Sequence, residues 1–143
     1  MDNELKQQVF TALCEDAPDA ILFADLEGKI RFWNAGAIAT FGYSAAEAIG
    51  QSLDLIIPEK LRQRHWDGYH QVMASGQSKY GSQLLSVPAL HKEKDRKLFS
   101  DFSIIMIKDD AGQLLGIAAI MRDSTAQKAR EKELRERIKE LEC

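Results

Sequence analysis

The sequence predicts an α+β domain, in which short helices lie between two groups of strands. Residues 20–34 hold two short apolar runs around a glycine, a pattern typical of a β-hairpin. Residues 35–75 lose this pattern and contain helix-capping signals, whereas residues 81–121 return to a period of two. Helices in series between two strand groups favour the α+β class.

The composition is that of a single soluble domain. With 143 residues, the chain can form one hydrophobic core without disulfides or a structural metal. The net charge of −3, with both signs interspersed, gives no reason to expect nucleic acid or a membrane as a partner. Two cysteines form no disulfide framework, and no apolar run approaches the roughly 20 residues that span a bilayer. We therefore expect a cytoplasmic protein, or the soluble part of a larger one.

The first part of the chain predicts a helix and then a hairpin. In residues 1–16, apolar side chains recur at helical spacing, at Leu5, Val9, Phe10 and Leu13. Pro18 ends this helix. Residues 20–25 and 30–34 predict two strands, and Gly28 supplies the positive φ of the turn between them.

The middle of the chain predicts short helices and one longer, central helix. Residues 35–42 are small and helical, and Ser44 with Glu47 has the spacing of a capping box. The central helix begins at Pro58, since the first turn tolerates proline, and Gly76 ends it.

Three further strands follow the central helix. Residues 81–90 predict a strand, although Pro88 restricts its end to a sheet edge or a bulge. His91 falls in a charged turn, where we expect it to be solvated. Residues 98–107 alternate, and residues 114–121 are so apolar that we expect them at the centre of the sheet.

The two faces of the 98–107 strand differ. The even-numbered positions are the more apolar set and are expected to face the core. Ile105 and Ile107 fall on the other face, where an apolar surface suits a partner or a packed terminal helix.

The last part of the chain predicts a charged helix. Leu134, Ile138 and Leu141 are spaced by four and three residues, which begins a coiled-coil seam. We therefore divide the chain into an N-terminal helix (1–16), a core (17–123) and a C-terminal linker helix (124–143).

Three stretches make the sequence resemble the PAS domain family. Asn34 follows the second strand, residues 41–50 are similar to the family's most recognisable stretch, and residues 122–128 resemble its strand-to-linker junction. The resemblance covers roughly residues 10–128. It implies a PAS fold, in which a five-stranded antiparallel sheet with short helices on one side encloses a pocket.

The resemblance also implies a sensory rather than an enzymatic domain, with its effector elsewhere. The residues agree, because no phosphate-binding glycine loop, catalytic triad or metal-ligand cluster is evident.

The central helix contains the candidate ligand-binding residue. Its apolar stripe includes a histidine, and its members are Leu61, His65, Tyr69, Val72 and Met73. A buried imidazole needs a partner. That partner is either a backbone carbonyl in the core, which is the commoner case, or a bound ligand.

The central helix also resembles that of FixL-type haem PAS domains. The shared features are Pro58-Glu59, Asp67-Gly68-Tyr69 and the closing Met73-Ala74-x-Gly76. Aligned without gaps from Pro58, His65 falls on the proximal iron ligand of that family. Aligned with a gap at Asp67, Trp66 takes this place instead.

The resemblance implies that haem b binds to His65 and that the domain senses a diatomic gas (O2, CO or NO) or a change of redox state. The pocket residues would be Tyr69 and an apolar wall of Leu85, Phe102, Ile104, Ile117 and Ala119. Leu85 falls near the distal arginine of those sensors, which disfavours arginine-gated oxygen binding. Gln83 could donate to a bound gas if a bulge turned it inward.

Two alternatives stay open. Residues 53–57 lack the reactive cysteine of light-sensing flavin domains, but a redox flavin could still contact Trp33 and Asn34. The chain could also bind a small metabolite or no cofactor. It would then be a dimerisation module that uses the N-terminal helix, the outer sheet face and the exit helix to drive a downstream signalling domain.

Overall fold

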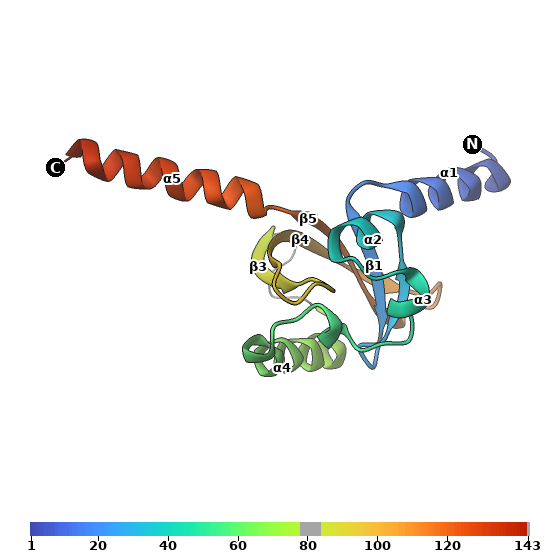
Figure 1. The fold of residues 1–143 in the computed structure, drawn as a ribbon. Coiled ribbons are helices and arrows are strands. Elements are labelled where there is room, and N and C mark those ends of the chain that lie inside the picture. Colours follow the sequence, from blue (N-terminus) through green and yellow to red (C-terminus); the bar gives the residue numbers. More distant parts are fainter. Residues whose placement is uncertain (78–83, 143) are drawn as a thin grey trace.

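The computed structural model describes residues 1–77 and 84–142. Its sheet has five antiparallel strands in the order β2-β1-β5-β4-β3, which confirms the α+β fold and the five-stranded sheet (Figure 1). The strands are β1 (Ala20–Asp25), β2 (Ile30–Trp33), β3 (Leu85–Leu90), β4 (Lys97–Lys108) and β5 (Leu114–Asp123). As predicted, β5 is central and β3, which contains Pro88, is an edge strand. The start of the strand predicted over 81–90 lies outside the described residues.

Helices flank the sheet on one side and extend from both of its ends. They are α1 (Asn3–Asp16), α2 (Ala35–Phe41), α3 (Ala45–Ala48), the 3-10 turn η1 (Leu53–Leu55), α4 (Glu59–Ser75) and α5 (Thr125–Glu142). Figure 1 shows α1 and α5 projecting from the domain in opposite directions, whereas α2, α3 and α4 lie close to the sheet. Residues of α2, α3, η1 and α4 share one buried core with the sheet.

Local signals in the sequence explain where the short helices begin and end. Ser44 and Glu47 form the predicted capping box, with each side chain accepting a hydrogen bond from the other's backbone N–H. Gly42 ends α2 at a φ of 85°. The structure corrects the prediction for His91, which is buried rather than solvated. Its ring packs on Gly42, and its Nδ1 accepts from the N–H of Glu93 at 2.9 Å.

The register of the sheet defines its two faces. Phe102 pairs with Leu85 on one side and with Met121 on the other, and Ile104 pairs with Ala119. Because paired residues share a face, the even-numbered side chains of β4 face the core, as predicted. The outer face exposes large apolar side chains, namely Phe99, Ile105 and Ile120.

Asn34 joins the N-terminal part of the chain to the sheet. Its Oδ1 accepts from the N–H of Ile21 at 2.8 Å and from that of Ala37 at 2.9 Å, which also caps α2. Its Nδ2 donates to the carbonyls of Cys14 at 2.8 Å and Asp19 at 3.0 Å. A single buried amide therefore fixes the end of α1, the start of β1 and the start of α2.

The junction between the sheet and α5 is also hydrogen-bonded. Buried Ser124 donates its N–H to the carbonyl of Phe99 at 2.8 Å and its hydroxyl to Asp101 at 3.1 Å. Thr125 Oγ1 in turn accepts from the N–H of Phe99 at 3.0 Å. The first residues of α5 are therefore hydrogen-bonded directly to β4.

Within the part of the chain that the structure describes, no helix is long and apolar enough to cross a membrane.

Replacing Asn34 tests its joining role. We expect Asn34→Ala to lower the free energy of unfolding by about 2–4 kcal/mol, because four backbone partners of a buried amide lose their hydrogen bonds. Urea denaturation measures this loss. A loss below about 1 kcal/mol would contradict this account, because it would mean that these hydrogen bonds contribute no more than a single typical one.

Candidate functional site

Helix α4 positions His65, the candidate ligand-binding residue. Pro58 occupies the N-cap position, Glu59 lies in the first turn, and Gly76 ends the helix at a φ of 70°. Val72 and Met73 pack against the core, so α4 covers part of the inner face of the sheet. Two larger side chains, Trp66 and Tyr69, fix the helix in place.

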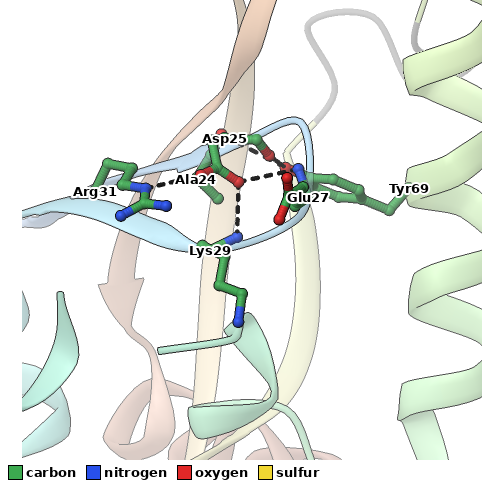
Figure 2. Close-up of polar contacts among 6 residues, drawn as sticks. All are labelled: Ala24, Asp25, Glu27, Lys29, Arg31 and Tyr69. Atoms are coloured by element: carbon green, nitrogen blue, oxygen red, sulfur yellow. Dashed lines mark hydrogen bonds and ion pairs between the residues drawn. The ribbon is translucent and has the colours of Figure 1, made fainter. Parts of the chain in front are cut away.

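Tyr69 ties α4 to the end of β1. It is 6% exposed, and its hydroxyl donates to the carbonyl of Asp25, with the carbonyl of Ala24 a further 3.5 Å contact (Figure 2). Burial raises the pKa of Tyr69 to about 12, so the hydroxyl keeps its proton. Tyr69 therefore presents its ring, and not a free hydroxyl, to anything bound beside His65.

The turn that receives Tyr69 is itself held by its own aspartate. Asp25 Oδ1 accepts from the N–H groups of Glu27 at 2.9 Å and Lys29 at 3.0 Å, and Oδ2 lies 2.7 Å from Nε of Arg31 (Figure 2). Burial opposes the charge on this carboxylate, but these hydrogen bonds outweigh burial and lower the pKa of Asp25. The turn stays fixed when α4 contacts it.

Trp66 makes the second contact of α4 with this turn. Its indole packs on Gly28, where an added Cβ would lie only 2.2 Å from the ring atom Cη2. Its Nε1 donates to Oδ1 of Asp54 at 2.7 Å, which ties α4 to η1. Trp66 is thus engaged in packing and in a hydrogen bond, so the structure favours His65 over Trp66 as the residue available to a ligand.

His65 lies against both aromatic rings. Its ring centroid is 4.7 Å from that of Trp66 and 5.7 Å from that of Tyr69. Its Nδ1 is buried and has no hydrogen-bond partner within residues 1–77 and 84–142. Burial lowers the pKa of His65 from 6.5, and the nearby Asp54 carboxylate opposes this only in part. The neutral form of the imidazole is therefore favoured at pH 7, and Nδ1 lacks a partner in the part of the chain that the structure describes.

The five predicted wall residues share the inner face of the sheet. Leu85 is paired with Phe102, Ile104 with Ala119, and Ile117 with Met106. Ile117 and Ala119 are buried, whereas Leu85, Phe102 and Ile104 are only half-buried, although they face inward. The structure thus groups the wall on the sheet, and groups His65 with Tyr69 on α4.

The structure also decides on other predicted contacts. Trp33 and Asn34 do not suit a flavin, because Trp33 is 4% exposed and donates Nε1 to the carbonyl of Tyr43 at 3.0 Å, while Asn34 is bonded throughout. Gln83 lies outside the described residues. The hydrogen bond between Asp54 and Trp66 was not predicted, because nothing in the sequence connects two residues that are twelve positions apart.

Comparisons with known proteins agree with this fold. Residues 14–129 match the model of the family described as the PAS fold. The sensor protein FixL of Bradyrhizobium diazoefficiens is 42% identical over 52 residues, which cover 36% of this chain and 10% of that protein. The oxygen sensor protein DosP of Escherichia coli is 24% identical over 137 residues, 96% of this chain and 17% of that protein. The chain thus spans a small part of each of these relatives.

Solved structures show the same architecture. A PAS domain from Colwellia psychrerythraea superposes with a TM-score of 0.69 at 25% identity, covering 85% of this chain and 97% of that one. An RNA-binding Light-Oxygen-Voltage receptor superposes with a TM-score of 0.78 at 17% identity, covering 97% of this chain and 39% of that one. At this identity the second likeness concerns the fold alone.

Removing the Tyr69 hydroxyl tests how α4 is held. We expect Tyr69→Phe to lower the free energy of unfolding by about 1 kcal/mol, since the Asp25 carbonyl keeps its bond from Gly28 and only one hydrogen bond is lost. Urea denaturation is the measurement. Tyr43→Phe is the matched control, because the Tyr43 hydroxyl bonds no residue of the described ranges; an equal loss in both variants would contradict the tether.

The lowered pKa of His65 predicts a pH dependence. Because the pKa of His65 is lower in the folded than in the unfolded state, the unfolded state binds more protons at this imidazole around and below pH 6.5. Stability should therefore fall as the pH drops through 6.5 toward the folded pKa. Urea denaturation at about pH 7.5 and about pH 5.5 measures this. His65→Gln should show a smaller loss than the wild type; an identical loss would mean that other groups cause it.

Proposed function

Because this chain belongs to the PAS family of sensor domains, we propose that it binds haem b through the imidazole of His65. The observation that supports this most directly is the state of that side chain. The lowered pKa of His65 favours its neutral form at pH 7, and its buried Nδ1 has no hydrogen-bond partner among the described residues. Iron coordination requires a neutral imidazole from a rigid element, which α4 provides.

Two groups of residues would contact a flat, apolar ligand at His65. Tyr69 and Trp66 hold α4 on the β1–β2 turn from the same side of the helix as His65, so the imidazole has a fixed orientation. The half-buried, inward-facing side chains of Leu85, Phe102 and Ile104 are the surface that such a ligand would cover. Covering apolar side chains excludes water and is favourable.

When bound, haem supplies an iron that takes up a diatomic gas (O2, CO or NO) or changes redox state. The roles of this chain's residues follow from their places. His65 would ligate, Tyr69 would contact the ring face beside it, and the wall residues Leu85, Phe102, Ile104, Ile117 and Ala119 would contact the macrocycle. The named relatives FixL and DosP, the latter an oxygen sensor by name, support this function.

The signal would leave through the sheet. Phe102 and Ile104 belong to β4, and β4 bonds the first residues of α5 through Phe99, Asp101 and Ser124. A ligand that moves β4 would therefore bias the direction of α5. We expect α5 to pass this change to a downstream signalling domain, through a homodimer that uses α1, the outer sheet face and α5.

An absorption spectrum of the purified protein after addition of haemin tests the ligand. We expect a Soret band in the wild type that is lost or shifted in His65→Ala, because the axial imidazole is removed. His70→Ala is the matched control, since His70 is exposed on the same helix and its ring lies beside Trp66. Wild type without a band, or equal loss in both variants, would contradict haem binding through His65.

A second function rests on a different observation. The outer sheet face exposes Phe99, Ile105 and Ile120, and α5 exposes Leu134 and Ile138 along its seam. Exposed apolar surface of this extent is typical of an interface. Without haem, the chain would then be a dimerisation module, which a dimer of the haem-free protein would support.

A further inference from the structure

An exposed basic groove runs along α5. It has a volume of about 490 Å³, and its lining side chains are Phe99, Lys128, Lys132, Arg135, Glu136 and Lys139. The four cations are spaced by four, three and four residues, which places them on one face of the helix. None of them forms an ion pair with a carboxylate of residues 1–77 or 84–142.

The shape of the groove indicates what occupies it. The distance from Lys128 to Lys139 is eleven residues along the helix, about 16 Å at 1.5 Å per residue. A groove whose positive charges extend along this length of helix fits another helix with negative charge better than a compact small molecule.

Helix α1 has the matching charges and the matching length. Glu4 and Glu15 are also eleven residues apart and lie on one helix face, with Gln8 and Thr11 between them. The helix is acidic overall and is exposed along almost its whole length. Figure 1 shows that α1 and α5 project in opposite directions, so α1 does not reach the groove of its own chain.

We propose that the groove on α5 binds α1 of a second copy of this chain, with the two helices antiparallel. The partner's Glu4 then lies opposite Lys139, and the partner's Glu15 lies opposite Lys128. The arrangement rests on the homodimer proposed above and gives its helices a specific pairing. A two-fold axis repeats the contact, with the first copy's α1 in the second copy's groove, so the assembly closes as a dimer.

The other forces agree with this orientation. Antiparallel helices place opposite ends of their dipoles together, which is favourable. Arg135 faces the partner's Gln8 and Glu136 faces the partner's Gln7, so the single acidic side chain in the groove meets no like charge. Phe99, at the sheet end of the groove, lies near the partner's Ala12 and Glu15, whose methyl and methylene groups cover its ring.

A charge exchange tests the pairing. The dissociation constant of the haem-free dimer is measured by sedimentation equilibrium for the wild type, Lys128→Glu/Lys139→Glu, Glu4→Lys/Glu15→Lys, and the variant with all four changes. We expect each double variant to weaken the dimer by about tenfold or more, because each change counts twice in a two-fold dimer. The fourfold variant should recover most of the affinity, since it restores every pair with exchanged signs.

The matched control is Arg130→Glu/Lys94→Glu, which changes the net charge equally at exposed positions off the groove. It should leave the dissociation constant within about threefold of the wild type, because the change in net charge alone has only a small effect when salt screens it. A wild type that dimerises but tolerates the groove variants, or no recovery in the fourfold variant, would overturn the pairing while the dimer stands. A wild type that stays monomeric would remove both the dimer and the pairing.

Discussion

The contact between α4 and the β1–β2 turn is the interaction on which the rest of the site depends. Trp66 and Tyr69 lie three residues apart on α4, and both reach residues 24–28 at the end of the hairpin. The turn can accept Trp66 because Gly28 has no side chain. The side chain of Asp25 fixes the backbone of the turn by accepting hydrogen bonds from the N–H groups of Glu27 and Lys29.

This arrangement explains why His65 differs from the other histidines. His91 bonds the N–H of Glu93 through Nδ1, and His70 is exposed to solvent. His65 alone among these three combines a buried, unpartnered ring nitrogen with a pKa lowered by burial. A buried polar atom without a partner is unfavourable unless something else satisfies it. A ligand that bonded Nδ1 would remove that cost.

The fold could be predicted from the sequence because its signals are local. The Ser44–Glu47 capping box, the glycines that end α2 and α4, and the alternation along β4 each require only a few neighbouring residues, and all are confirmed. The contacts around the site could not be predicted from the sequence, because they join residues that are far apart in the chain. Nothing local shows that Trp66 bonds Asp54 or that Tyr69 reaches Asp25, and the charged neighbours of His91 hide its burial on Gly42. The residues on one helix face were predictable, but what each of them contacts was not.

The most direct test of the account is the iron–imidazole bond itself. Resonance Raman spectra of the haem-loaded, reduced protein, grown with natural and with ¹⁵N-labelled histidine, would show whether iron is bound to a histidine nitrogen. The account predicts an isotope-sensitive iron–histidine stretching band in the wild type and in His70→Ala, and its absence in His65→Ala. A band that persists in His65→Ala, or that is absent from the wild type, would contradict the assignment of His65 as the ligand.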